Sequence, residues 1–191
     1  MRALLLLLVG CADVAQPFEL DHARVMAIRV DPPTVPAGEP ARIEVLVTDA
    51  EHGPHLATEV SVEAIGATVG RDDRGWYAIG DGTLPIVPLE ITAETLPAQK
   101  TLAIGARAEN PATPIIEGID RIAIGMEATL SIEGADDALS YRWFSSIGDL
   151  TGYTRAEATL DPIAARGAIV AVVRDQAGGT NWTIAPVEVQ P

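Results

Sequence analysis

Short segments in which apolar and polar residues alternate make up most of this chain. In residues 42–49 the apolar side chains of Ile43, Val45 and Val47 are spaced two apart, which is typical of a β-strand with one buried face. Similar patterns predict strands over residues 25–30, 42–49, 59–64, 75–79, 88–93 and 100–107 in the first half, and over 121–124, 128–133, 139–144, 157–160, 168–174 and 183–189 in the second.

The predicted fold is all-β, because turns rich in glycine and proline separate these segments and none has convincing helix caps. The pattern breaks at residues 108–114, where Pro111 and Pro114 favour an extended connector. We therefore expect two tandem β-sandwich domains over residues 24–109 and 115–191, joined by a linker over 110–114. A long surface loop within one domain is the alternative.

Both predicted domains resemble immunoglobulin-like modules. A strand, the turn Pro36-Ala37-Gly38-Glu39 and an alternating strand that ends at Thr48-Asp49 resemble the opening of many bacterial immunoglobulin-like modules. In the second half, Tyr141-Arg142-Trp143-Phe144 resembles the third strand of a polycystic-kidney-disease-type (PKD-like) module, and residues 169–180 resemble its late strand and Asp-x-x-Gly turn. The resemblance implies that Trp143 packs between two sheets.

The N-terminal residues carry a second resemblance. An apolar run over residues 3–9 leads into Leu8-Val9-Gly10-Cys11, which resembles the lipobox of a bacterial lipoprotein signal. This implies a signal peptide over residues 1–10, cleavage between Gly10 and Cys11, and lipidation of Cys11. Residues 11–23 are then expected to be a tether that contains Pro17. Docking of Phe18 and Leu20 on the first module is the alternative to free motion of that tether.

Lipidation would determine where the protein resides. Each buried methylene contributes roughly 0.8 kcal/mol, so the two or three acyl chains of a lipoprotein (palmitate among them) give firm attachment to a membrane. No other run of about 18 apolar residues predicts a spanning helix. We therefore expect a lipid-anchored cell-envelope protein, and Ala12 after the cysteine favours the outer membrane, with the protein facing the periplasm or the surface.

Composition restricts the set of partners. The chain has 13 Lys and Arg against 27 Asp and Glu, for a formal net charge of −14. Removal of residues 1–10 takes away Arg2 alone and leaves 12 against 27, or −15. Such a charge disfavours nucleic acid and anionic lipid, which bind clusters of Lys and Arg. Cys11 is the only cysteine, so no disulfide is expected within the chain. No cofactor is expected.

The sequence offers few candidate metal-ligating or catalytic residues. His52 and His55, near Asp49 and Glu51, are the only histidine cluster and the only candidate zinc ligands. The intervening Gly53-Pro54 is equally typical of an ordinary polar loop, and a loop without metal is the expectation. The chain has no Gly-x-Ser-x-Gly or His-Glu-x-x-His motif, so we do not expect an enzyme.

Binding is the remaining class of function. The leading hypothesis is a non-catalytic structural or protein-binding role in the envelope, with an envelope protein as partner, since exposed sheet edges can accept an extra strand. The first alternative is a carbohydrate-binding adhesin that uses Trp76 and Trp182 as aromatic platforms. The second alternative is an envelope hydrolase with a pair of facing carboxylates.

Overall fold

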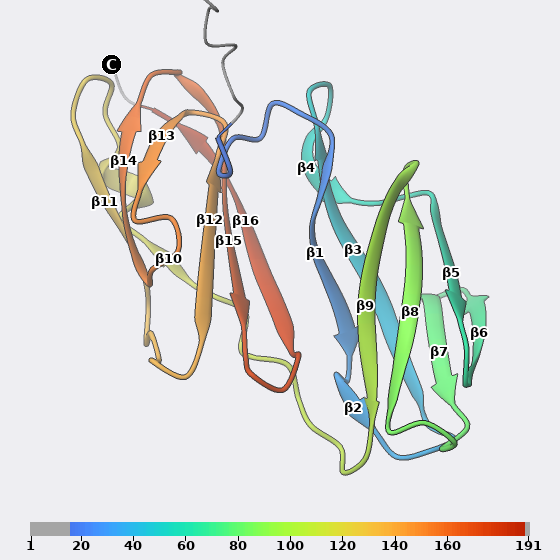
Figure 1. Cartoon of the computed structure of the whole chain (residues 1–191). Helices are drawn as coiled ribbons and strands as arrows, with labels where there is room; N and C mark the ends of the chain where they lie inside the picture. Colours follow the sequence, from blue (N-terminus) through green and yellow to red (C-terminus); the bar gives the residue numbers. More distant parts are fainter. Residues whose placement is uncertain (1–15, 190–191) are drawn as a thin grey trace, which may run out of the picture.

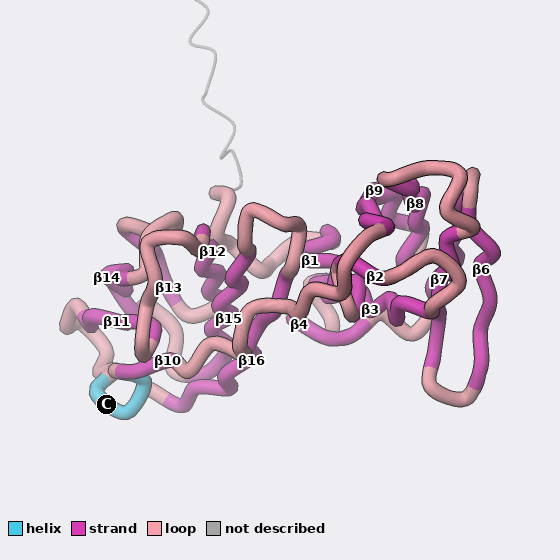
Figure 2. Tube along the Cα trace, turned by 90° about the horizontal axis from the view of Figure 1, so that it is seen from below, coloured by secondary structure: helices cyan, strands magenta, loops and turns pink. Residues whose placement is uncertain are grey.

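The computed structural model describes residues 16–189 of the 191-residue chain. The predicted signal peptide and Cys11 therefore lie outside the described residues. Two β-sandwiches lie side by side, the first built from β1 to β9 and the second from β10 to β16 (Figure 1). The view from below shows β1 and β16 between the two sandwiches (Figure 2).

The first sandwich has the strand order of an immunoglobulin-like domain. One sheet has the order β1-β3-β7-β6, with β4 also paired to β3, and the other has the order β2-β9-β8-β5. Lettered from A to G with β2 as A′ and β4 as an addition, these sheets are A-B-E-D and A′-G-F-C. The strands are β1 (Arg24–Asp31), β2 (Thr34–Val35), β3 (Pro40–Asp49), β4 (Gly53–Leu56), β5 (Val60–Ala64), β6 (Ala67–Asp72), β7 (Gly75–Gly80), β8 (Ile86–Ala93) and β9 (Leu96–Ile104).

The second sandwich has the seven-strand order of an immunoglobulin constant-type domain. Its sheets, β10-β11-β14-β13 and β12-β15-β16, correspond to A-B-E-D and C-F-G. The strands are β10 (Ile116–Glu117), β11 (Ala128–Ile132), β12 (Ser140–Ser145), β13 (Gly148–Thr151), β14 (Glu157–Pro162), β15 (Arg166–Arg174) and β16 (Thr180–Glu188). The expected all-β fold of tandem immunoglobulin-like sandwiches is confirmed.

Each sandwich has its own apolar core between its sheets. In the first, alternate residues of β3 and β8 point inward, with Val45 and Leu89 among the most buried. In the second, Trp143 on the third strand is fully buried. Its indole Nε1 donates a hydrogen bond to the Arg155 carbonyl at 2.8 Å, so the polar edge of the ring has a partner inside the core.

A third apolar cluster joins the two sandwiches. The outward face of the β12-β15-β16 sheet contributes Phe144, Val170, Val172 and Trp182, and the first sandwich contributes Met26, Ala27 and Leu46. Because β15 also points Ile169 and Ala171 into its own sandwich, both faces of this strand are buried. The sandwiches are therefore in contact through a core of their own.

The described part of the expected tether, residues 16–23, is packed against the folded domains. Phe18 lies in the core of the second sandwich, 5.5 Å from the Tyr153 ring between centroids, and its carbonyl accepts a hydrogen bond from the Ser145 N–H at 2.8 Å. Leu20 lies in the cluster between the sandwiches. Burial of these two apolar side chains outweighs the freedom of a loose segment, so Phe18 and Leu20 follow the docking alternative rather than free motion.

The predicted linker over residues 110–114 is bonded to both sandwiches. Asn110 donates to the Val30 carbonyl at 3.0 Å and accepts from the Thr180 N–H at 2.8 Å. The Asn181 side chain donates to the Pro111 carbonyl at 3.0 Å. These bonds hold the connector at the opposite end of the interface from the segment that precedes β1 (Figure 1).

Several local predictions differ from the structure. The strand expected over 121–124 is replaced by a 3₁₀ turn at Ile119–Arg121 and a loop. Five strands were not predicted: the two-residue β2 and β10, and β4, β6 and β13, whose glycines and Pro54 are typical of turns. β4 nevertheless forms, since it pairs with β3 alone and an edge strand tolerates proline.

Candidate binding groove and metal-ligating cluster

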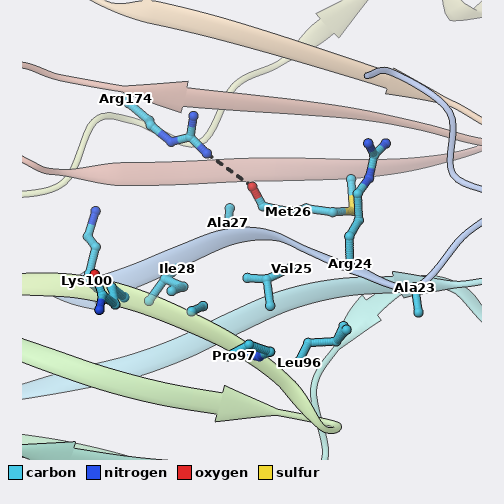
Figure 3. Close-up of a pocket in the computed structure, with 12 residues that line it drawn as sticks. Ala23, Arg24, Val25, Met26, Ala27, Ile28, Leu96, Pro97, Lys100 and Arg174 are labelled. Atoms are coloured by element: carbon cyan, nitrogen blue, oxygen red, sulfur yellow. Dashed lines mark hydrogen bonds between the residues drawn. The ribbon is translucent and has the colours of Figure 1, made fainter. Parts of the chain in front are cut away.

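A groove of about 550 Å³ opens where the first sandwich meets the second. Its walls are the first half of β1 and the first half of β9, and Arg174 of β15 closes it from the second sandwich (Figure 3). We call this the β1/β9 groove. It mixes apolar side chains such as Val25 and Leu96 with the charged Lys100 and Arg174.

The groove exposes the free edge of a sheet. From Leu96 to Leu102, β9 pairs only with β8, because the two-residue β2 reaches no further than Ala103 and Ile104. In an antiparallel ladder alternate amides point away from the partner strand. The N–H of Ala103 points away from β8 and donates to the Pro33 carbonyl at 3.2 Å. By the same alternation, the amides of Gln99 and Thr101 point outward.

A β-bulge shapes the opposite wall. The pairing of β1 with β3 shifts between Val25 and Ala27, so Met26 has no partner in the ladder. The bulge turns the Met26 side chain into the cluster between the sandwiches, while its carbonyl accepts a hydrogen bond from Arg174 Nη2 at 3.1 Å (Figure 3). A bulge that re-aims one residue in this way is common at functional sheet edges.

Three cationic side chains line the groove of this acidic protein: Arg24, Lys100 and Arg174. Among the described residues, their hydrogen bonds go to carbonyl and hydroxyl oxygens, and none forms an ion pair with a carboxylate. Lys100 Nζ, for example, donates to the Gly178 carbonyl at 2.7 Å and to Thr180 Oγ1 at 3.0 Å. The groove is thus a local positive region.

Burial lowers the pKa of each of these groups. Desolvation is the main cause for Arg24, Lys100 and Arg174. Nearby carboxylates partly oppose this effect on the pKa: Asp21 and Glu19 act on Arg24, and Asp175 acts on Lys100. A cation that is partly desolvated and has no carboxylate in direct contact is stabilised by an incoming anion. The arrangement therefore suits a carboxylate-bearing chain that lies along the free edge of β9.

A second constellation lies where the turn between β3 and β4 meets the β8–β9 hairpin. Ligand atoms of Asp49, His55 and Glu94 all lie within 4.8 Å of one another, and each residue is half-buried. His55 Nε2 is 3.2 Å from both carboxylate oxygens of Glu94. Glu94 is brought there by a tight turn in which it and Thr95 have φ values of 49° and 73°. Glycine and asparagine are the usual residues in this conformation.

His52 occupies the outer side of this cluster. The backbone N–H of His52 and its Nδ1 both bond to Asp49, at 2.6 Å and 3.1 Å, and lower the pKa of that carboxyl to about 2. In return the Asp49 carboxylate raises the pKa of His52. The His52 and His55 rings lie 5.7 Å apart between centroids. The two histidines singled out from the sequence are therefore neighbours, but only His55 belongs to the group of three.

The two tryptophans proposed as sugar platforms do not share a surface. Trp182 is buried between the sandwiches, and the Arg29 guanidinium lies over its ring at 4.8 Å. Trp76 lies on β7 of the first sandwich, half-buried, with no hydrogen-bond partner for its Nε1 among the described residues. A concave aromatic platform made from both is therefore absent from residues 16–189.

Sequence reasoning missed the groove cations and Glu94. One signal was present: residues 168–173 are continuously apolar, which is typical of a strand buried on both faces. That pattern could have indicated that this sheet packs against a second domain. Within residues 16–189, no helix has the length and apolar character needed to cross a membrane.

Comparisons with known proteins give distant structural similarity only. No family model and no curated protein matches the chain. The adhesin InvE of Yersinia pseudotuberculosis is similar at 13% identity and a TM-score of 0.30, over 85% of this chain and 58% of that one. Domains 5–6 of the S-layer protein SbsC give 16% identity and a TM-score of 0.33, over 88% and 99% of the two chains.

The tandem Ig repeats of Dlar give 13% identity and a TM-score of 0.33, over 88% of this chain and 98% of that one. The chain spans little more than half the length of the InvE structure. These scores are too low to transfer a function to this chain.

Proposed function

We propose that this chain is a non-catalytic, lipid-anchored protein of the bacterial cell envelope that binds a protein partner in the β1/β9 groove. The observation that supports the proposal most directly is the groove itself. A free sheet edge lies beside three cations that have no carboxylate partner, in a chain of net charge −14. Binding needs no catalytic group, and the groove offers a specific recognition surface.

The partner proposed is an extended, acidic segment of a protein. Such a segment can add to β9 through the outward amides of Gln99 and Thr101, while its carboxylates bind Lys100 and Arg174. Each main-chain hydrogen bond contributes about 0.5–1.5 kcal/mol, and bonds to charged groups contribute about 1.5–3 kcal/mol. A short strand with two acidic side chains therefore has enough contacts for specific binding.

The Leu8-Val9-Gly10-Cys11 motif supports the anchoring part of the proposal. Because Phe18 and Leu20 are buried, the spacer is short. Only five peptide bonds separate Cys11 from Gln16, where the described structure begins. A fully extended chain of that length spans at most about 18 Å. A lipid on Cys11 would therefore hold the sandwiches close to the membrane, with Phe18 and Leu20 at the near end. An outer-membrane location follows only from Ala12 and is part of the proposal.

Site-specific photo-cross-linking in the native bacterium tests the groove. A photoreactive phenylalanine analogue at Gln99, on the exposed edge of β9, should give a discrete cross-linked protein. The same probe at Thr129, on the far sheet of the second sandwich, is the control and should give none. Mass spectrometry of the product should identify an acidic segment as the attached region.

Charge reversal makes the test specific. Lys100→Glu with Arg174→Glu should abolish the Gln99 product, whereas Arg166→Glu, an exposed position on the same strand as Arg174, should leave it intact. Absence of any Gln99 product, or its persistence after charge reversal, would contradict the proposed groove. Cell fractionation of a Cys11→Ala variant tests anchoring separately, and wild-type membrane retention would refute the lipid.

A further inference from the structure

We propose that Asp49, His55 and Glu94 bind one divalent transition-metal ion of the zinc type, with a further coordination position open to water. The proposal does not depend on the β1/β9 groove. It concerns the point where the β3–β4 turn of one sheet meets the β8–β9 hairpin of the other. The three residues offer one imidazole nitrogen and two carboxylates, a donor set found in zinc sites.

The distances place the ligands near coordination geometry. Tetrahedral bonds of about 2.1 Å put neighbouring ligand atoms about 3.4 Å apart. The His55 Nε2 and the Glu94 carboxylate oxygens are already 3.2 Å apart, and the remaining pairs lie within 4.8 Å. A closure of about 1 Å, within reach of rotation of half-buried side chains, brings Asp49 into the same shell.

The hydrogen-bond partners of His55 leave Nε2 facing the Glu94 carboxylate. Nδ1 lies 2.8 Å from the Gly53 carbonyl, which can only accept, so Nδ1 carries a proton. Nε2 then faces both Glu94 oxygens at equal distance, and an ionised carboxylate also only accepts. Either a proton on Nε2 or a bound metal ion satisfies both groups, and the nearby Asp49 carboxylate supplies the third ligand that a metal ion would use.

This arrangement of His55 is the one that metal-binding histidines use. Their second nitrogen donates to a backbone carbonyl or a carboxylate, which fixes the tautomer and orients the ring toward the metal. The Gly53 carbonyl provides this support from within β4. The imidazole ligand favours zinc or a similar ion over calcium, which takes six to eight oxygens.

Asp49 and Glu94 are held independently of His55. Oδ1 of Asp49 accepts the backbone N–H groups of Glu51 and His52, at 2.7 Å and 2.6 Å. Oε1 of Glu94 accepts the backbone N–H of Thr58 at 3.1 Å. Loss of one ligand should therefore leave the other two in place, which makes single substitutions informative.

His52 is assigned no coordination bond. Its Nδ1 is bonded to Asp49 Oδ2, its side chain is largely exposed, and it lies outside the group whose ligand atoms are mutually close. The proposal therefore distinguishes two histidines that the sequence alone could not separate. Removal of His52 should weaken metal binding little, while removal of His55 should weaken it strongly.

Calorimetric titration with ZnCl₂ near neutral pH tests the proposal. The full chain is used, with Cys11→Ser in every variant so that the thiol cannot bind zinc. The expected result is saturable binding of one ion per chain, accompanied by a higher thermal midpoint. His55→Ala and Glu94→Gln should each weaken binding by at least about tenfold, since even second-shell partners contribute about 10- to 100-fold.

Matched variants separate the site from surface binding. His52→Ala and His22→Ala, both at partly or largely exposed histidines, should change the affinity by less than about threefold. Circular dichroism without zinc shows whether each variant is folded, and visible absorption of a Co²⁺ complex reports its coordination. No saturable binding, wild-type affinity in folded His55→Ala, or an equal loss in His22→Ala would overturn the proposal.

Discussion

At the scale of single residues, the first sandwich has two unusual features: the backbone conformation of Thr95 and the hydrogen bonding of the Asp72 carboxylate. Thr95 has a φ of 73° in the β8–β9 turn, although a β-branched residue is strained in the left-handed region. The Asp72 carboxylate accepts two hydrogen bonds from Arg42, at 2.6 Å and 2.7 Å, and one from the Arg74 N–H. Each leads to a measurable consequence.

Thr95→Gly should stabilise the protein. Relief of the left-handed strain outweighs the extra freedom that glycine gives the unfolded chain, for a net gain of about 0.5–1 kcal/mol. Chemical denaturation measures the change in the free energy of unfolding. The control is Thr101→Gly, within β9, which should destabilise. A lower stability for Thr95→Gly would contradict the turn geometry.

The Arg42–Asp72 pair should make stability depend on pH. Hydrogen bonds from Arg42 lower the pKa of Asp72 from 3.8 to about 2 in the folded state. A lowered folded-state pKa contributes stability above the unfolded pKa, and this contribution is lost as the pH falls. The free energy of unfolding should therefore decline from about pH 4 to pH 2.

Asp72→Asn should make that decline shallower and lower the stability at neutral pH. Urea denaturation across the pH series provides the measurement. Asp137→Asn, at an exposed position before β12, is the control and should preserve the wild-type slope. An unchanged slope in Asp72→Asn would show that the pair does not contribute in this way.

At the scale of elements, β9 is the strand on which the proposed function depends. Its residues alternate between amides that bond to β8 and amides that point into the groove. Pro97 already occupies an outward position, where a missing N–H breaks no bond. The same reasoning separates two neighbouring positions further along the strand.

Gln99→Pro should cost about 1 kcal/mol or less, whereas Ala98→Pro should cost about 3 kcal/mol or more, because only the Ala98 amide bonds to β8. Thermal and chemical unfolding of the two variants measure the difference. Equal destabilisation by both would show that the edge of β9 is not free.

Alternation of apolar residues was sufficient to predict most strands of both sandwiches. It was insufficient for β4, β6 and β13, whose stability comes from pairing with a neighbouring strand rather than from their own sequence. It also placed the start of β9 too late, because Leu96-Pro97 is typical of a turn and only the free edge permits the proline. The groove could not be predicted, since it joins residues from β1, β9 and β15 that are far apart in sequence.

At the scale of the whole molecule, the apolar cluster between the sandwiches makes them behave as one body. Val172 is almost fully buried there, on the outward face of its own sheet. Val172→Asp would bury an unpaired charge while the sandwiches are together, but the charge is hydrated once they separate. Each sandwich keeps its own core in either state.

Wild-type protein should therefore show one cooperative thermal transition, and Val172→Asp should show two at lower temperatures. Differential scanning calorimetry measures both, and small-angle scattering should show a larger radius of gyration for the variant. Thr129→Asp, on the exposed face of the opposite sheet, is the control. A single transition at the wild-type temperature in Val172→Asp would contradict a stabilising interface.

The sequence predicted two sandwiches but not the apolar interface through which they pack against each other. Phe18 and Leu20 follow a lipoprotein-like N-terminus, where the sequence left open both a loose tether and docking on the first module, and both residues are buried. Their burial depends on surfaces of both sandwiches that exist only after folding. The same holds for the metal-ligating cluster, since Glu94 is 39 residues from His55 along the chain.

Hydrogen exchange at the outward amides of β9 tests the central claim most directly. The amides of Gln99 and Thr101 should exchange rapidly in the free protein and slowly after addition of the acidic segment identified by cross-linking at Gln99. The amides of Ala98 and Lys100, which bond to β8, should be slow in both states. Unchanged, rapid exchange at Gln99 and Thr101 in the bound protein would contradict addition of a partner strand in the β1/β9 groove.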